Sequence, residues 1–546
     1  MVKRPQPSAT RQSAADALAF AFRLHDAGQL DEAAALASDL LRRQPKLAGA
    51  HYLAGLIALQ RGAAPRALDH LVQAERHGPP SPSLSLALAR AHAATGARDA
   101  AIAHYQAAVR GAPDVAEARF GLGVALLQAG RFLEALVELE RDVALRPEHA
   151  EGFNNLGSVL RELGRLPEAI AAFEQAVRLR PDYSRALSNL GVALADAGQP
   201  ARAIATIERA LALAPDNPGA LNNLGHVRKA QRDYDGAIET FARLAALRPS
   251  DAEPLLNLGL VEQMRERHDA ACAAFERALA LREDARGWFC LGKSAAALGD
   301  TRRATTAYRR ALALDPADTC GAGLALAVMG AAVTPPVAPE RYVQELFDGY
   351  AARFENELVG NLNYRAPEIL HALFAPNVKL DAKLDIIDLG CGTGLGGAAF
   401  RTMARRLDGI DLSARMIEQA RARAIYDALA VGELIAYLAA GAADRYDLAL
   451  ATDVLVYFGE LGPVFAAVRR VLRAGGWLLF SVERRIDADD GFALHDGHRY
   501  VHGRGYVVEQ AARAGLAVVT IEDTSTRTDR GEPVPSLAVL LRKPAT

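Results

Sequence analysis

The run Ile386-Ile387-Asp388-Leu389-Gly390-Cys391-Gly392-Thr393-Gly394-Leu395-Gly396 decides the fold of the C-terminal part of this chain. An apolar strand ends in the carboxylate of Asp388 and passes directly into a glycine-rich turn. Without a Cβ, glycine lets the backbone bend sharply and lets a ligand lie against the chain. We expect residues 397–407 to form a helix whose first N–H groups point at whatever the turn holds. The carboxylate would repel a pyrophosphate and attract an ammonium group.

This run resembles the first motif of class I S-adenosylmethionine-dependent methyltransferases, acid-x-Gly-x-Gly-x-Gly. Residues 392–397 also fit the Gly-x-Gly-x-x-Gly pattern of nicotinamide-binding folds, but that pattern usually starts where the strand ends. The methyltransferase resemblance implies an α/β Rossmann-like domain with a seven-stranded mixed sheet and S-adenosyl-L-methionine as cofactor. It assigns cofactor binding to Asp388, Gly390, Gly392 and Gly394.

Length and composition indicate several globular domains. The 546 residues exceed one compact core, and 23% of them are charged, with a formal net charge of −2. Because the chain has no excess of basic residues, we do not expect nucleic acid or an anionic membrane as a partner. The four cysteines form no Cys-x-x-Cys pair and the N-terminus lacks an apolar signal segment, so we expect a cytoplasmic protein.

Residues 13–318 form an array of about nine repeats. Proline recurs every 34 residues from Pro45 to Pro249, with alanine twelve residues before each proline and usually a bulky residue eight before it. This pattern resembles the tetratricopeptide repeat, in which two antiparallel helices cross at small residues and proline turns the chain into the next unit. The resemblance implies an all-α superhelix whose concave face holds a protein or peptide.

Four asparagines share one position of the repeat, 34 residues apart: Asn155, Asn189, Asn223 and Asn257. They resemble the asparagine ladder of the O-linked N-acetylglucosamine transferase superhelix. That resemblance places them in the concave groove, where their amides would bind an extended peptide backbone. In the other interpretation each asparagine bonds the adjacent repeat.

Between the two parts we expect a linker over residues 319–340, stiffened by Pro335, Pro336 and Pro339. The segments 347–355 and 362–367 then resemble the N-terminal helices of a predicted family of tetratricopeptide-fused methyltransferases. The resemblance implies that these helices cap the cofactor, with Tyr350, Tyr364 and Arg365 near its methionine end. Helix packing explains the two tyrosines equally well.

The other predicted strands supply further candidates. Residues 407–413 are predicted to form a short strand that ends in an acid. The family pattern Gly-x-Asp-x-Ser assigns the ribose-binding acid to Asp411, not Asp408. The resemblance places Tyr457 on the substrate side, as a catalytic candidate. It adds the following cofactor-binding candidates: Leu412, Met416, Glu433, Asp453 and Val454.

Three histidines, His495, His498 and His502, fall within eight residues. A metal site would need a further spaced ligand, so we predict no metal here. The family resemblance places Arg499-Tyr500-x-His502 in a substrate-side loop. His502 is then the best candidate for a catalytic base, because imidazole titrates near neutrality.

Together these patterns predict a disordered tail over residues 1–12, repeats to residue 318, and a methyltransferase domain over residues 341–546. The predicted function is methylation by a domain whose repeats recruit a protein or peptide partner, which could itself be the methyl acceptor. Two alternatives stay open: a small-metabolite methyltransferase with repeats serving only assembly, and a cofactor-binding scaffold without turnover. The sequence leaves the acceptor atom and the oligomeric state open.

Overall fold

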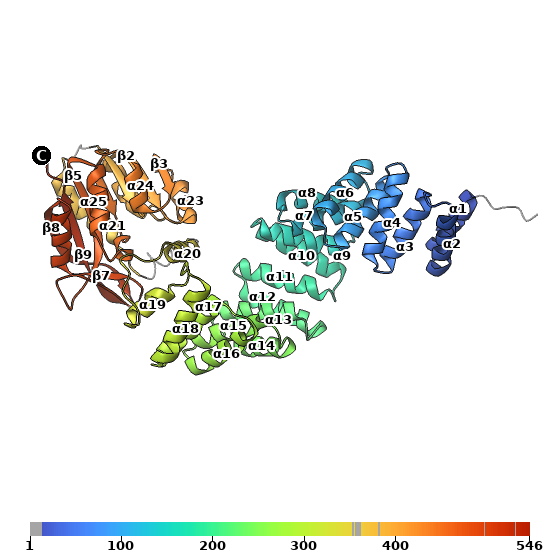
Figure 1. The fold of residues 1–546 in the computed structure, drawn as a ribbon, viewed down its shortest axis with the longest axis horizontal. Coiled ribbons are helices and arrows are strands. Elements are labelled where there is room, and N and C mark those ends of the chain that lie inside the picture. Colours follow the sequence, from blue (N-terminus) through green and yellow to red (C-terminus); the bar gives the residue numbers. More distant parts are fainter. Residues whose placement is uncertain are drawn as a thin grey trace, which may run out of the picture. The chain divides into compact units, whose positions relative to one another are not determined.

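The computed structural model describes residues 14–351, 354, 362–379, 383–495, 497–529 and 531–545 (Figure 1). The chain divides into two compact units, one ending at Pro249 and one beginning at Ser250. The predicted disordered tail and part of the cofactor-capping segment, including Arg353 and Glu355, lie outside the described residues.

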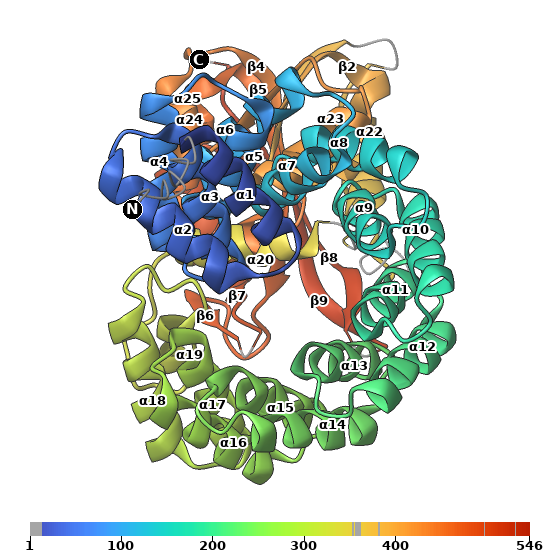
Figure 2. The ribbon, with the colours of Figure 1, turned by 90° about the vertical axis from the view of Figure 1, so that its right-hand side faces the viewer.

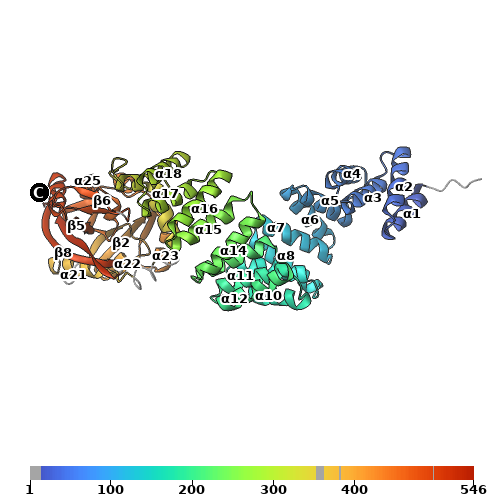
Figure 3. The same cartoon turned by 90° about the horizontal axis from the view of Figure 1, so that it is seen from below.

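Within the described residues, nine antiparallel helix pairs form the repeat array, and successive pairs follow one another in sequence order (Figures 1 and 3). The first seven pairs belong to the first unit and the last two to the second. The helices are α1 (Ala14–Asp26), α2 (Leu30–Arg43), α3 (Ala48–Gln60), α4 (Ala64–His77), α5 (Pro82–Ala94), α6 (Arg98–Gly111), α7 (Ala116–Gln128), α8 (Phe132–Leu145), α9 (Ala150–Glu162), α10 (Leu166–Leu179), α11 (Ser184–Asp196), α12 (Pro200–Leu213), α13 (Pro218–Ala230), α14 (Tyr234–Leu247), α15 (Ala252–Met264), α16 (His268–Leu281), α17 (Ala285–Ala297) and α18 (Thr301–Leu314).

The small residues of each repeat stand where the two helices cross. A Cβ on Gly157 would lie 2.8 Å from the ring of Phe173, and one on Gly225 would lie 2.6 Å from Phe241. Glycine therefore lets the bulky residue of the second helix reach the first. Phe173 and Phe241 are both buried, which confirms the predicted crossing.

A mixed sheet forms the core of the C-terminal part (Figure 2). Its main path runs β3-β2-β1-β4-β5-β7-β6, and β9 joins antiparallel to β5 and to β8. The strands are β1 (Leu384–Leu389), β2 (Ala404–Asp411), β3 (Ala428–Val431), β4 (Tyr446–Ala451), β5 (Leu472–Arg484), β6 (Phe492–Leu494), β7 (Tyr500–His502), β8 (Ala517–Asp529) and β9 (Glu532–Arg542). The short β6–β7 hairpin adds two strands to the seven expected.

Around the sheet lie short helices and single 3₁₀ turns. They are α21 (Ala366–Phe374), η2 (Ala375–Asn377), α22 (Leu395–Phe400), η3 (Arg401–Met403), α23 (Ala414–Ala422), α24 (Leu434–Ala440), η4 (Leu455–Tyr457), α25 (Gly462–Val471) and α26 (Arg504–Arg513). The helix predicted over residues 397–407 was too long. Residues 404–407 instead pair with β1, because Leu407 is a buried strand residue opposite Ile386.

Parallel pairing brings the carboxyl ends of β1, β2 and β4 to one edge of the sheet. Leu389 pairs with Ile410, and Asp388 pairs with Leu450. The glycine turn after β1, Asp411 at the end of β2 and Asp453 after β4 therefore meet at this edge, where open α/β sheets bind ligands.

The predicted linker is not a free connection. Tyr500 Oη donates to Pro335 O at 2.8 Å, Gly459 N and Glu460 N donate to Pro336 O at 2.8 Å, and Ala338 N donates to Tyr457 O at 2.9 Å. Within it, α19 (Ala322–Val328) contributes to the core of the last repeats and, through Leu324, to the core of the sheet domain. Residues 335–338 of the predicted linker are thus bonded to the sheet domain.

We therefore expect a fragment of residues 331–546 to be more stable than one of residues 340–546. The shorter fragment loses four hydrogen bonds, each worth about 0.5–1.5 kcal/mol, so the difference should be about 2–6 kcal/mol. Urea unfolding of both fragments measures it. Equal stabilities would show that residues 331–339 are a passive linker.

Candidate active site

A cavity of about 850 Å³ opens at the carboxyl edge of the sheet. Its walls come from the segment 337–339, from α20 (Glu340–Tyr350), from the glycine turn and from the ends of β2 and β4. The predicted site residues on its wall are Tyr350, Tyr364, Gly390, Gly392, Asp411, Leu412, Glu433, Asp453, Val454 and Tyr457. Most other lining groups are apolar, so the cavity suits a ligand with few charges or one whose charges meet these acids.

The glycine turn needs its glycines for conformation and for space. Gly390, Gly392 and Gly394 have φ of 65°, 54° and 96°, a region that other residues rarely adopt. A Cβ on Gly390 would lie 2.4 Å from Val454. Gly394 precedes α22 and is not on the cavity wall, so its role here is conformational.

Asp411 lies at the cavity wall with its carboxylate fixed by backbone donors. Gly392 N donates to Oδ2 and Ser413 N donates to Oδ1, both at 2.9 Å. Burial raises the pKa of Asp411, and these two N–H groups oppose that shift. Each oxygen keeps a second lone pair, so the carboxylate can accept two further hydrogen bonds from a ligand.

Asp388 lies under the turn and not on the cavity wall. Tyr426 Oη donates to its Oδ2 at 2.7 Å, while Oδ1 has no hydrogen-bond partner among the described residues. Burial raises the pKa of Asp388 to about 7, against the opposing hydrogen bonds from Tyr426 and Gly397. The predicted direct contact with a ligand ammonium is therefore unsupported. Asp388 shapes the turn and contributes negative potential below it.

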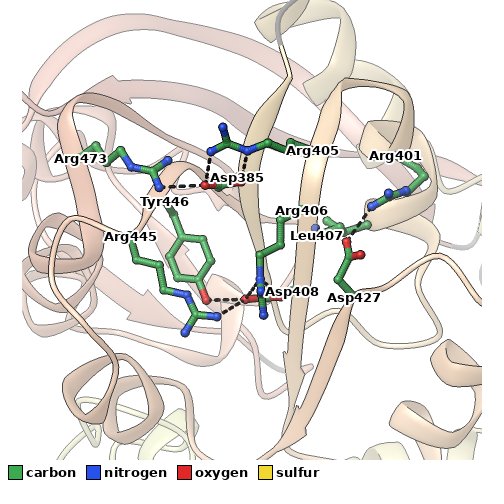
Figure 4. Close-up of polar contacts among 10 residues, drawn as sticks. All are labelled: Asp385, Arg401, Arg405, Arg406, Leu407, Asp408, Asp427, Arg445, Tyr446 and Arg473. Carbon is green, nitrogen blue, oxygen red and sulfur yellow. Dashed lines mark hydrogen bonds and ion pairs between the residues drawn. The ribbon is translucent and has the colours of Figure 1, made fainter.

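Asp408, the other acid of β2, has a structural role (Figure 4). It is fully buried and accepts hydrogen bonds from Arg406, Arg445 and Tyr446. A nearby group joins Asp385 to Arg405 and Arg473. Both clusters stand away from the cavity wall, which agrees with the assignment of the ligand-binding acid to Asp411.

A buried ionic group reaches the cavity wall through Asp453 and Arg499. Arg499 Nη2 donates to Asp453 Oδ1 at 2.5 Å, and Arg499 Nε donates to Glu483 Oε1 at 2.6 Å. Arg527 also donates to Glu483, at 2.9 Å. The Arg499 guanidinium lies 5.5 Å from the ring centroid of Tyr457. Sequence reasoning gave no site role to Arg499, which lines the cavity, or to Glu483, which pairs with it, because the bonded partners stand 46 and 16 residues apart.

Helix α20 covers part of the cavity. Its apolar residues Val343, Leu346 and Phe347 line the cavity, and Ser413 Oγ donates to Asp348 Oδ1 at 2.5 Å. Tyr350 and Tyr364 also line it, as predicted. Arg365 does not: it is exposed at the start of α21, and its backbone N–H donates to Thr526 O. Its assignment is corrected, because an exposed side chain off the wall cannot hold a ligand there.

Two other predicted residues act as supports. Met416 is a fully buried residue of α23 and is not on the cavity wall, so it packs in the interior and does not cover a ligand. Glu433 lines the cavity, but its carboxylate caps α24 by accepting from Ile435 N at 2.9 Å and Ala436 N at 2.6 Å. This cap uses one lone pair on each oxygen.

His502 is wrongly predicted as a base. It is fully buried off the cavity wall, and its Nε2 lies 2.8 Å from Phe458 O. Burial lowers its pKa to about 4, so the ring is neutral at physiological pH. His498 lies beside Tyr342, 3.2 Å from its hydroxyl. Searching the described residues finds no group of three metal-ligating side chains.

Two of the four repeat asparagines tie adjacent repeats together. Asn189 Nδ2 donates to Asn154 Oδ1, and Asn223 Nδ2 donates to Ser188 Oγ, both at 2.9 Å. Each of these acceptors stands 35 residues before the asparagine that bonds to it. The residue 35 positions before Asn155 is Phe120, whose phenyl ring offers no such acceptor. Asn257 is buried. The peptide-ladder assignment is thus corrected for Asn189 and Asn223, whose amides each spend one N–H on the scaffold.

Replacing Asn189 and Asn223 together by alanine should therefore destabilise the array by about 1–3 kcal/mol, as two hydrogen bonds of about 0.5–1.5 kcal/mol are lost. Asn155→Ala is the matched control and should leave the melting temperature nearly unchanged. Thermal unfolding of both variants measures this. If the double variant melts like the control, the amides serve something other than the scaffold.

Comparison with known proteins agrees with both halves of this architecture. A tetratricopeptide-repeat model matches residues 18–82, 86–150 and 154–218, and related repeat models match residues 194–258 and 285–318. A model described as a methyltransferase domain matches residues 387–480, which include the glycine turn, Asp411 and Asp453.

Relatives with established names match the C-terminal part. The chain is 33% identical over 148 residues to the biotin biosynthesis bifunctional protein BioCD of Bordetella avium, covering 26% of this chain and 30% of that protein. It is 29% identical over 107 residues to the ubiquinone biosynthesis O-methyltransferase of Thiobacillus denitrificans, covering 18% and 44%. The chain thus spans less than half the length of these relatives.

Solved structures resemble each half separately. The tetratricopeptide protein YrrB is 26% identical, with 33% of this chain and 92% of that chain covered and a TM-score of 0.30. An S-adenosylmethionine-dependent methyltransferase from Mesorhizobium loti is 24% identical, with 31% and 96% covered and a TM-score of 0.26.

The fold and the site define a two-part protein, a helical repeat superhelix followed by a Rossmann-like α/β domain. More particularly, the chain carries tetratricopeptide repeats in its N-terminal part and a class I methyltransferase domain at its C-terminus. None of its described helices is long and apolar enough to cross a membrane.

Proposed function

We propose that this protein is an S-adenosyl-L-methionine-dependent methyltransferase. The observation that carries the proposal is the Asp411 carboxylate, held at the cavity wall by Gly392 N and Ser413 N with lone pairs free for two hydroxyls. The close approach that Gly390 and Gly392 permit supplies the space beside it. These features fit a nucleoside with a ribose diol and a cationic side chain.

When bound, the cofactor supplies a methyl group on a sulfonium centre, which needs no further activation by the protein. The chain's own residues then bind, orient and exclude water. Asp411 and Leu412 hold the nucleoside end, the Asp453 carboxylate favours the cationic end by its charge, and Asp388 adds to this only in its ionised form. Helix α20 and the segment 337–339 cover the cavity and keep water from the reacting atoms.

Tyr457 is the proposed acceptor-side residue. It lines the cavity, it is almost completely buried, and its ring contacts Phe347 of α20 edge-on with centroids 5.5 Å apart. Burial raises its pKa, so the phenol stays protonated and can donate a hydrogen bond to the acceptor. With His502 excluded, no side chain of the described wall is an imidazole base.

We further propose that the repeats recruit a protein or peptide partner, which can be the methyl acceptor, and that the protein works in the cytoplasm. Stacked helix pairs present a concave surface suited to polypeptides, and the four cysteines are free thiols, as a reducing compartment requires. Methylation of a small metabolite, with the repeats serving assembly, is the alternative.

Mass spectrometry of a cell lysate incubated with the protein and isotopically labelled S-adenosylmethionine separates these cases. The proposal expects label on a polypeptide, and expects less of it when residues 14–249 are deleted. Label on a small molecule irrespective of the repeats would support the alternative. No transfer by a protein that binds the cofactor would identify a scaffold.

Asp411→Ala should weaken S-adenosylmethionine binding by about 2–3 kcal/mol, because two hydrogen bonds to a charged acceptor are lost. Isothermal titration calorimetry measures the change. Glu509→Ala, on the exposed face of α26, is the control and should bind like the wild type. An unchanged affinity in Asp411→Ala would remove Asp411 from the binding site.

A further inference from the structure

We infer that Arg499 is a positioning residue that keeps the Asp453 carboxylate ionised and fixed at the cofactor cavity. The inference rests on the proposed function and adds to it a role for Arg499, a residue that the family resemblance placed only in a substrate-side loop. Arg499 itself comes from the β6–β7 hairpin, which is additional to the seven-stranded plan.

The two carboxylates and two guanidinium groups of this ionic group have opposite and equal total charges. Asp453 pairs with Arg499, Arg499 also pairs with Glu483, and Glu483 pairs with Arg527. The side chains are 9–16% exposed. Charges this deeply buried are costly, and removing one partner leaves the other uncompensated. Loss of Arg499 would strand Asp453 alone, since Glu483 retains Arg527.

The backbone of Asp453 is held as firmly as its side chain. Its φ of 56° lies in the left-handed region that residues other than glycine rarely adopt. Such a conformation persists only where the surroundings enforce it. Ser481 Oγ accepts from Asp453 N at 3.2 Å, and Arg499 fixes the side chain from the opposite end.

The hairpin that carries Arg499 is a rigid support. Tyr500, next to Arg499, is fully buried and bonds Pro335 O, and His502 bonds Phe458 O from the other end of β7. This gives His502 a role as an anchor of the hairpin. A guanidinium on a rigid support can direct a carboxylate geometrically as well as neutralise it.

The groups that face Asp453 are Arg499, Glu483, Arg527, Tyr457 and Tyr364. Burial raises the pKa of Asp453, and Arg499 is the largest opposing influence. Without Arg499 the carboxyl would take up a proton more readily as the pH falls, and the cavity would lose a negative charge that attracts a cationic ligand.

The test measures binding of S-adenosylmethionine by calorimetry at pH 6 and pH 8. Arg499→Met should raise the ratio of the dissociation constant at pH 6 to that at pH 8 above the wild-type ratio, because the unpaired Asp453 carboxyl is then protonated more readily at the lower pH. Arg499→Lys keeps the charge and should bring the ratio back toward the wild-type value. Arg484→Met is the matched control, because Arg484 follows Glu483 on β5 but pairs with exposed Asp523.

A double-variant comparison separates positioning from packing. If Arg499 acts through Asp453, then Asp453→Asn combined with Arg499→Met should bind no more weakly than Asp453→Asn alone. This pair also decides the matter if Arg499→Met does not fold, since neither protein holds an unpaired Asp453. The inference would be overturned if the losses of binding free energy in the two single variants added fully in the double variant. It would also be overturned if a folded Arg499→Met had the wild-type ratio of dissociation constants at pH 6 and pH 8. Absence of binding by the wild-type protein would instead overturn the proposed function.

Discussion

Asp388→Asn should raise the free energy of unfolding by about 4 kcal/mol at pH 8 and by almost nothing at pH 4. Asp388 is fully buried, and its pKa rises from 3.8 to about 7 in the folded protein. Between these values the unfolded state has released its proton while the folded state retains it. The wild type therefore loses stability as the pH rises from about 4 to about 7.

The amide of asparagine has nearly the shape of the carboxyl group and does not ionise, so the variant avoids this loss. Chemical denaturation at a series of pH values measures the difference. Asp385→Asn, three residues earlier on β1, is the matched control with the opposite sign. Its pKa is lowered to about 2 by Arg405 and Arg473, so the wild type gains stability above pH 4 and loses it as the pH falls through 2. A pH-independent effect of Asp388→Asn would show that its carboxyl is not held protonated by burial.

Asp408→Asn should lower the free energy of unfolding by about 3 kcal/mol and leave cofactor affinity unchanged. Asp408 is fully buried between Arg406, Arg445 and Tyr446 (Figure 4). Breaking a buried pair costs about 3–5 kcal/mol, and partial exposure of both arginines places this case at the low end.

Asp411→Asn is the comparison for Asp408→Asn, since both acids stand on β2 three residues apart. It should reverse the pattern, with weaker binding and little loss of stability, because burial already disfavours the Asp411 carboxylate. Urea unfolding and calorimetry on both variants give the two readouts. Weakened binding by Asp408→Asn at unchanged stability would exchange the roles of the two acids.

The sequence predicted those parts of the fold that depend on local and periodic patterns. The 34-residue spacing of proline and alanine defines the repeats because each repeat has the same packing problem to solve. The turn from Asp388 to Gly394 could be predicted because its positive φ angles require glycine. Asp411 could be predicted because an acid is needed at the end of the second strand. These local requirements leave a direct trace in the sequence.

The remaining site depends on contacts between distant segments. Arg499 reaches Asp453 across 46 residues, and Pro335 reaches Tyr500 across 165, so no spacing rule could pair them. His502 resembled a base by residue type and motif, but its burial against Phe458 is a tertiary property. The asparagine bonds were foreseeable in part. The acceptors Asn154 and Ser188 stand 35 residues before Asn189 and Asn223, whereas Phe120 stands 35 residues before Asn155.

The central claim is that the cavity at the carboxyl edge of the sheet binds S-adenosylmethionine through Asp411 and the glycine turn. Isothermal titration calorimetry of the full-length protein tests it most directly. The structure predicts one cofactor per chain, with affinity that rises between pH 6 and pH 8 as Asp388 ionises. Binding of a nicotinamide dinucleotide in preference, or no binding of S-adenosylmethionine by the folded protein, would contradict it.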